Sequence, residues 1–86
     1  MDAVQSFMSS QYMSTTEDTS DVRKILGRNV RSRREFLSLS QEELGLRINA
    51  DQAYVSRLER GLLNPTLDSI VEVALALEIK TQKLFS

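Results

Sequence analysis

Residues 52–60 combine an apolar face with a face of hydrogen-bonding side chains, at the spacing of a helix. Val55 and Leu58, three apart, mark the face that we expect to be buried. The side chains expected on the opposite face are Gln52, Ala53, Ser56 and Arg57. The amide of Gln52 can donate and accept in one plane, which suits the edge of adenine, and the guanidinium of Arg57 can form a fork with guanine. This face favours the reading of nucleic-acid bases, and the alternative is a solvated polar helix surface.

The other side chains near this face have less specific chemistry. Ala53 is small enough either to meet a thymine methyl group or simply to allow close approach of the helix. Ser56 can contact a base, contact a phosphate or face water. Tyr54 can reach a phosphate through its hydroxyl or pack its ring against the loop. Gln52 and Arg57 therefore carry the specific part of the prediction.

The segment before this helix is expected to form a shorter helix that supports it. Ser40 is a good N-cap for a helix over residues 41–48, and Glu43, three residues later, completes a capping box. Leu44 and Ile48, four apart, give this helix its apolar edge. Two short helices are thus predicted, one directly after the other.

A turn of three residues, 49–51, separates the two helices. Asn49 tolerates a left-handed backbone and can end the first helix in place of a glycine, and Asp51 can cap the second. A turn this short forces a steep crossing. Gly45, which costs up to ~1 kcal/mol within a helix, indicates that a backbone comes close at that crossing. The spacing predicts a helix–turn–helix unit, with an ordinary helical hairpin as the alternative.

The rest of the domain also has helical spacing and no run that alternates with period two, so the predicted fold class is all-α with five helices. Besides 41–48 and 52–60, which Gly61 ends, the predicted helices span residues 21–37, 67–77 and 82–85. Their expected N-caps are Ser20, Thr66 and Thr81. The residues expected to face the core are Val22, Ile25, Leu26, Val30 and Leu37 in the first of these helices and Leu67, Ile70, Val71, Ala74 and Leu77 in the second. Arg33 falls close to the buried side, so we expect its stem over the core and its head in water.

The charges divide the chain into an acidic leader and a more basic domain. The net charge is −1, from eleven basic and twelve acidic side chains, yet residues 1–21 contain four acidic side chains and no basic one. Six bases fall between Arg23 and Arg34 with no acid among them. That run is a modest electrostatic signal for a nucleic-acid partner, against the alternative of a solvated face. We expect an acidic, flexible or loosely packed extension over residues 1–20 and one domain over residues 21–86.

The missing residue types exclude several kinds of chemistry. Without Cys or His, the chain has no disulfide, no thiolate chemistry and no usual zinc site. The adjacent carboxylates Glu42 and Glu43 lie on an exposed helix start, so we expect no enzyme activity, no cofactor and no metal. No apolar run approaches the ~20 residues of a membrane span, and the first residues do not resemble a signal peptide. A cytoplasmic location is expected.

Together these residues resemble the Xre family of helix-turn-helix proteins, of the lambda-repressor and Cro type. The resemblance runs over residues 26–85, on the segments LGRNVRSRR, LSQEELGLRI, YVSRLERGLLNPTLDSIVEVALAL and IKTQKLF. It implies a lambda-repressor-like domain that binds double-stranded DNA. Three positions depart from the family pattern: Ser38 replaces Gly, Gly45 replaces Ala and Asn49 replaces Gly. The run YVSRLERGLLNPTL also resembles the controller proteins of restriction–modification systems, which are small dimeric members of this family.

The resemblance also implies roles for individual residues. The positions that match the family's base contacts are Gln52, Ala53, Ser56 and Arg57. The candidate phosphate contacts, aided by backbone N–H groups at helix starts, are Gln41, Tyr54, Arg60 and Asn64. A family ion pair between the first helix and the end of the reading helix matches Arg34 and Glu59, for which the alternative is two exposed charges.

The function expected from these features is sequence-specific transcriptional regulation by a homodimer on a palindromic operator. One reading helix sees only a few base pairs, so two copies would read half-sites about one helical turn, ~34 Å, apart. The residues expected at the dimer surface are Leu62, Leu63, Ile79, Leu84 and Phe85. The first alternative is an antitoxin that represses its own operon, with residues 1–20 as the candidate surface for a protein partner. The second is a protein-interaction module without DNA binding.

Overall fold

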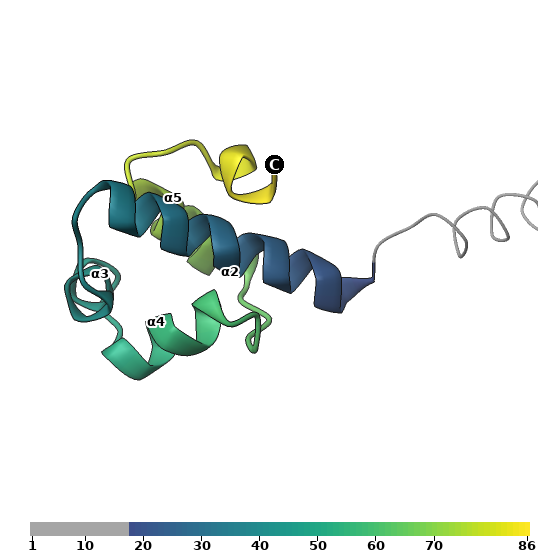
Figure 1. Cartoon of the computed structure of the whole chain (residues 1–86), viewed down its shortest axis with the longest axis horizontal. Coiled ribbons are helices and arrows are strands. Elements are labelled where there is room, and N and C mark those ends of the chain that lie inside the picture. The colour runs from purple at the N-terminus through teal and green to yellow at the C-terminus, as the bar shows by residue number, and fades with distance from the viewer. Residues whose placement is uncertain (1–17) are drawn as a thin grey trace, which may run out of the picture.

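The computed structural model describes residues 18–86, which form four α-helices and a final 3-10 helix (Figure 1). The elements are α2 (Thr19–Phe36), α3 (Gln41–Arg47), α4 (Gln52–Glu59), α5 (Leu67–Ala76) and the 3-10 helix η1 (Thr81–Phe85). No strand occurs among these residues, which confirms the predicted all-α class for them. The fifth predicted α-helix is instead the 3-10 helix, a form suited to so short a segment. Residues 1–17, which hold most of the predicted extension, lie outside the described residues.

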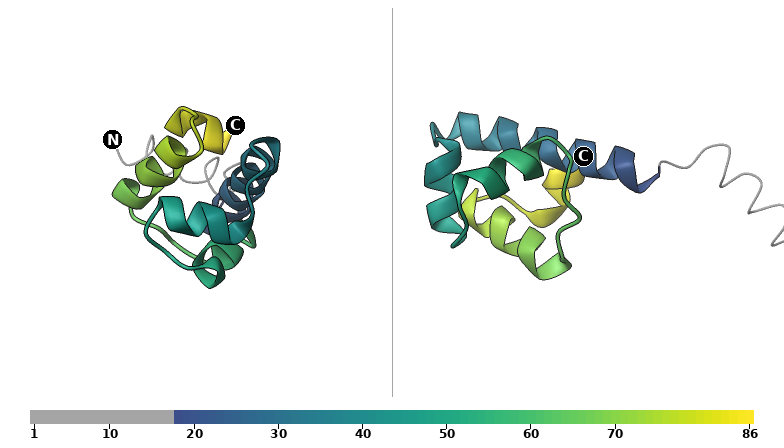
Figure 2. Two further views of the ribbon diagram at one scale, coloured as in Figure 1. Left: turned by 90° about the vertical axis from the view of Figure 1, so that its left-hand side faces the viewer. Right: turned by 90° about the horizontal axis from the view of Figure 1, so that it is seen from below.

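α2 is the longest helix and contacts both parts of the domain. In Figure 1, α4 runs below α2, α3 lies across one end, η1 lies above and α5 lies behind. The two views in Figure 2 show the same grouping, with α3 and α4 on one side and α5 and η1 on another. The buried apolar side chains between the helices are Leu26, Val30, Leu44, Val55, Leu58, Ile70, Val73, Ala74, Leu77 and Leu84. Every element thus contributes to one core.

α2 begins two residues earlier than the sequence predicted. Asp18, not Ser20, is its N-cap, and Asp18 Oδ1 accepts a hydrogen bond of 3.0 Å from the N–H of Asp21. Both Asp and Ser are good caps, so residue type does not decide between them. Val22, predicted to face the core, is 38% exposed because the first turns of α2 extend beyond the other helices (Figure 1).

The core face of α5 is only partly the predicted one: Ile70, Ala74 and the C-cap Leu77 are buried as predicted. Its buried residues are Ile70, Val73 and Ala74. Leu67 and Val71, which were expected in the core, are 81% and 43% exposed. α5 is apolar on more than one side, so two helical stripes fit its sequence and packing decides which is buried.

No helix within residues 18–86 is long and apolar enough to cross a membrane.

Two side chains of α2 fix the ends of the elements beside it. Arg33 Nε donates to the carbonyl oxygen of Leu77 at 2.9 Å, and its Nη2 donates to that of Glu78 at 3.0 Å. Asn29 Nδ2 donates to the carbonyl oxygen of Leu84 at 2.9 Å. Carbonyl groups at a helix end have no partner within the helix. The guanidinium of Arg33, which was expected in water, therefore supplies hydrogen bonds to the free carbonyl groups at the end of α5.

Two glycines allow helix backbones to meet. At Gly45, a Cβ atom would lie 2.9 Å from the carbonyl oxygen of Ala50, which confirms the predicted close approach at the crossing of α3 and the turn. At Gly27, on α2, a Cβ atom would overlap the carbonyl oxygen of Glu59 and lie 2.6 Å from that of Leu58. The second contact was not predicted. It shows that α2 lies directly on the backbone of α4.

Gly27→Ala is expected to lower the free energy of unfolding by about 1–3 kcal/mol, because the added methyl group would push α2 away from the carbonyl groups of α4. Ser32→Ala, on the exposed side of α2, is the control and should leave stability unchanged or slightly higher. Urea unfolding followed by circular dichroism measures both variants. A Gly27→Ala protein as stable as the wild type would show that the helices separate without cost.

Candidate nucleic-acid interface

Each helix of the predicted helix–turn–helix unit begins with a side-chain cap. Ser40 Oγ accepts a hydrogen bond of 2.9 Å from the N–H of Glu43, and Glu43 Oε1 accepts one of 2.8 Å from the N–H of Ser40, which is the predicted capping box. Asp51 Oδ1 accepts from the N–H of Tyr54 at 2.8 Å and caps α4. Between the helices, Asn49 has φ 56°, the left-handed conformation predicted for it. The start and direction of α4 are therefore set locally.

α4 presents its predicted polar face to solvent. Gln52, Ala53 and Arg57 are exposed and Ser56 is half-buried. On the opposite side, Val55 and Leu58 are 0% and 2% exposed and anchor the helix in the core. A helix held by one face can offer the other to the major groove of DNA, which is wide enough to admit it.

A chain of hydrogen bonds joins the core to the first residue of α4. Arg34 Nε donates to Glu59 Oε2 at 2.6 Å and Arg34 Nη2 donates to Glu59 Oε1 at 3.0 Å. Gln41 Nε2 donates to Glu59 Oε1 at 3.1 Å, and Gln52 Nε2 donates to Gln41 Oε1 at 2.6 Å. The chain runs from α2 through the end of α4 and the start of α3 to the exposed face of α4.

The charge of Glu59 sets the direction of the hydrogen bonds in this chain. An ionised carboxylate only accepts, so Gln41 must turn its NH₂ group to Glu59 and its carbonyl oxygen to Gln52. Gln52 must then turn its own NH₂ group to Gln41. Its carbonyl oxygen and one N–H remain for an outside partner, and these are the two groups that match the edge of adenine.

The Arg34–Glu59 pair is buried although both residues are charged. Their side chains are 10% and 3% exposed. Arg34 Nη1 also donates to the carbonyl oxygen of Leu39 at 2.7 Å, so the guanidinium is well supplied with acceptors. The hydrogen bond to Glu59 raises the pKa of Arg34 above its ordinary value, although burial acts in the other direction. The alternative of two exposed charges does not describe this pair.

The predicted phosphate contacts have different surroundings. Arg60 and Asn64 are exposed, the first at the C-cap of α4 and the second in the loop that follows. Arg60 Nε also donates to the carbonyl oxygen of Ser56 at 3.3 Å. Gln41 is half-buried and its amide is held by two partners, so one side-chain N–H remains for a phosphate beside the free backbone N–H groups at the start of α3. Contact of these residues with DNA stays a prediction.

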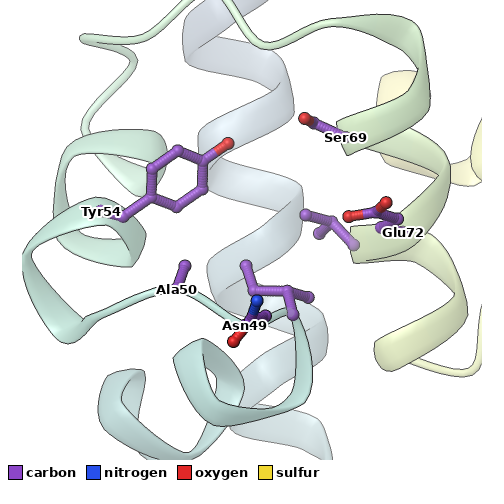
Figure 3. Close-up of a pocket in the computed structure, with 7 residues that line it drawn as sticks. Asn49, Ala50, Tyr54, Ser69 and Glu72 are labelled. Carbon is purple, nitrogen blue, oxygen red and sulfur yellow. The ribbon is translucent and has the colours of Figure 1, made fainter.

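Tyr54 lies between α4 and α5. Its ring is half-buried and packs against the core. Figure 3 shows its hydroxyl directed towards Ser69 of α5, across a cavity of about 290 Å³ that Asn49, Ala50 and Glu72 also line. Of the two roles open to Tyr54, the structure shows packing of the ring; the phosphate contact stays a prediction.

The residues predicted at a dimer surface fall into three groups. Leu62 and Phe85 are 58% and 38% exposed. Leu63 and Ile79 are half-buried and pack against the core. Leu84 is 0% exposed, so its assignment to the dimer surface was wrong: the side chain fills the core, where a second chain cannot reach it.

A larger exposed apolar surface lies on α5 and was missed in the sequence. Leu67, Val71 and Leu75 are 81%, 43% and 73% exposed. They recur every four residues, so they form one stripe along the helix. That spacing was a usable signal, but Leu67 and Val71 had been assigned to the core.

A capped helix, a short turn with a left-handed residue and a second helix with a polar exposed face define a helix-turn-helix DNA-binding domain. The model of the helix-turn-helix family HTH_3 matches residues 30–84. The chain belongs to this Xre-like family of DNA-binding transcriptional regulators, which confirms the sequence resemblance.

Proteins of known name are similar over most of the chain. The HTH-type transcriptional regulator y4dJ of Sinorhizobium fredii (strain NBRC 101917 / NGR234) is 41% identical over 64 residues, covering 74% of this chain and 83% of that protein. The control protein C.SmaI of Serratia marcescens is 36% identical over 66 residues, covering 77% of this chain and 79% of that protein. The crystal structure of the restriction–modification controller protein C.AhdI from Aeromonas hydrophila matches with a TM-score of 0.74 at 35% identity, covering 80% of this chain and 100% of that one.

Glu43 should give the helix–turn–helix unit a measurable pH dependence. The hydrogen bonds from the backbone N–H and with the side chain of Ser40 lower the pKa of Glu43 below its ordinary value. A lowered folded-state pKa means that the stabilisation is complete above the unfolded pKa of about 4.3 and is lost as the pH falls through the folded value. Melting temperatures between pH 3 and 7 should therefore fall less steeply in acid for Glu43→Gln than for the wild type.

Glu42→Gln is the control, because Glu42 is an exposed neighbour outside the capping box. It should follow the wild-type profile. If Glu43→Gln also follows that profile, the capping carboxylate contributes nothing to the acid sensitivity.

Proposed function

We propose that this protein is a sequence-specific transcriptional regulator that binds a palindromic operator as a homodimer. The observation that carries the proposal is the hydrogen-bond chain of Arg34, Glu59, Gln41 and Gln52, which presets an amide on the exposed face of α4. Phosphates carry no sequence information, so a protein that bound only the DNA backbone would gain nothing from an oriented amide. Reading of base edges does use it, which also argues against a protein-interaction module.

A second copy of the chain is the proposed occupant of the exposed stripe on α5. One α4 helix covers only a few base pairs, and two copies related by a two-fold axis would place two such helices about one DNA turn, ~34 Å, apart. Leu67, Val71 and Leu75 offer the apolar surface that such an interface needs. Val71 and Leu75 also line a hollow of about 450 Å³ that extends to Ile79, where side chains of the second copy could insert.

The relatives support a narrower role in the control of a restriction–modification operon. C.SmaI is named as a control protein and C.AhdI as a restriction–modification controller protein, and both are similar to this chain over most of their length. The role is proposed for this chain on that similarity. An antitoxin would need a toxin-binding surface on residues 1–20, and nothing in residues 18–86 supports it.

Leu75→Glu is expected to shift the protein towards the monomer, because the buried interface would have to accept an unpaired charge. The control is Leu46→Glu, which adds the same charge at a leucine of α3 that is 76% exposed and lies outside the stripe. Sedimentation velocity at micromolar concentration, with and without a duplex selected from random DNA, measures the oligomeric state. A wild type that stays monomeric on that duplex would refute the proposed dimer. Equal dissociation of both variants would refute the α5 stripe as its interface.

Arg57→Ala is expected to cost ~1–3 kcal/mol on the selected site and to relax preference at one base pair in each half-site, as for a lost bidentate base contact. Asn64→Ala should weaken all duplexes alike, since its proposed partner is a phosphate. Gln41→Ala should do both, because its loss also releases the amide of Gln52. Competition binding over all single-base variants of the site, at one salt concentration, separates the three patterns. Equal loss on every variant for Arg57→Ala would assign this residue to a phosphate.

A further inference from the structure

The run of six bases on α2 is only partly used inside the domain. Arg33 and Arg34 bind carbonyl groups and Glu59, and Arg31 pairs with Glu35 at 3.3 Å. Of the other three, Arg23 is half-buried, and Lys24 and Arg28 are exposed. Within the described residues, neither takes part in an ion pair or a side-chain hydrogen bond. Their positive charges therefore remain available to a partner outside the chain.

The position of these two bases around α2 is fixed by their neighbours in sequence. Leu26 and Val30 form the edge of α2 that lies in the core. Gly27 comes next around the helix and touches the backbone of α4. Lys24 and Arg28, four apart, form the edge beyond Gly27, on the side of the α4 contact away from the core. The basic edge of α2 is thus adjacent to α4.

The order of residues around the axis of α4 likewise shows which of its side chains lie nearest to the basic edge of α2. Glu59 points to α2, and the positions that follow around α4 are Ser56 and Arg60, next to the exposed face with Arg57. The residue after Arg60 lies close to the basic edge of α2: a Cβ atom on Gly61 would lie 3.1 Å from Lys24 Cγ. α2 and α4 therefore form a corner with the basic edge on one wall and the face proposed to read DNA on the other.

We infer that Lys24 and Arg28, together with Arg60, bind the phosphate backbone of a DNA strand that flanks the groove occupied by α4. The inference rests on the proposed function, and it extends the DNA contact to a part of α2 outside the helix–turn–helix unit. A helix in the major groove has a phosphate strand along each side, and the corner between α2 and α4 follows one of them. Asp21 and Glu35 stand at the two ends of the basic edge, so the unopposed charge is limited to the middle, above Gly27.

The test compares the double variant Lys24→Gln, Arg28→Gln with the matched control Lys80→Gln, Lys83→Gln, which removes two exposed bases from η1 and its N-cap. Glutamine keeps the carbon stem that Lys24 rests on Gly61. Affinity is measured between 50 and 300 mM salt on a duplex selected from random DNA and on an unrelated duplex of equal length. Each phosphate contact contributes about 0.9 to the slope of log affinity against log salt concentration, so the slope should fall by about 1–2 for the α2 variant.

Two further readouts keep the outcome unambiguous. Affinity for the selected and the unrelated duplex should fall by the same factor, because phosphate contacts do not distinguish sequences. Trimming base pairs from the ends of the selected duplex should weaken the wild type before it weakens the α2 variant. An unchanged slope, or an equal fall for the η1 control, overturns the inference. A wild type that binds both duplexes equally would instead refute sequence-specific reading, while the slope comparison would still stand.

Discussion

The buried ion pair of Arg34 and Glu59 constrains how α2, α3 and α4 can lie against one another. Taking a charge out of water costs several kcal/mol, so each of these groups needs all of its partners. Arg34 lies on α2, Gln41 at the start of α3 and Glu59 at the end of α4, and Leu39 lies in the loop between α2 and α3. Rotation of α2 or α4 would leave a buried charge unpaired, at a cost of about 3–5 kcal/mol. Rotation of α3 would remove the hydrogen bond from Gln41 to Glu59. The pair therefore contributes a unique arrangement more than it contributes net stability.

α2 connects this arrangement to the rest of the domain through different faces. Gly27 and Arg34 meet α4, whereas Asn29 and Arg33 hold the backbone at the end of α5 and in η1. The absence of a side chain at Gly27 sets how close α2 and α4 can be. On the other face of α2, the hydrogen bonds from the guanidinium of Arg33 to the carbonyl groups at the end of α5 fix the position of that helix. The exposed stripe of α5 is thereby held at a fixed angle to the face of α4.

How far the sequence predicts this structure depends on the range of the interaction involved. The capping box of Ser40 and Glu43, the left-handed Asn49 and the two faces of α4 follow from residues within one or two turns, and all were predicted. The contact of Gly27 with α4 was not, because it joins residues some thirty positions apart and leaves no periodic signal. Ser38 likewise has φ 58° without being a glycine, which only its place after α2 explains.

α5 shows a second kind of limit. Its sequence is apolar on more than one face, so hydrophobic periodicity alone fits both the stripe that is buried and the stripe that is exposed. The sequence prediction therefore placed Leu67 in the core and Leu84 at the surface, and the structure reverses both. Hydrophobicity predicts which residues avoid water, but it does not distinguish burial within one chain from burial between two. Of the hydrogen-bond chain that ends at Gln52, the family resemblance implied only the Arg34–Glu59 pair. The two contacts of the Gln41 amide join residues distant in sequence and leave no periodic signal.

The charges of the domain follow from the same geometry. A net charge of −1 says little about a nucleic-acid partner, because bases of one helical run serve different purposes according to their place around α2. The charge of Arg34 is balanced by the carboxylate of Glu59 inside the fold. The guanidinium of Arg33 keeps its charge but is held by carbonyl groups at the end of α5. Lys24 and Arg28 remain exposed on α2, with Lys24 next to Gly61 after α4, while Asp68 and Glu72 are exposed on α5, a different element. An overall acidic chain can in this way keep a locally basic surface next to the helix that would enter the groove, since screening by salt limits the reach of exposed charges to about 10 Å.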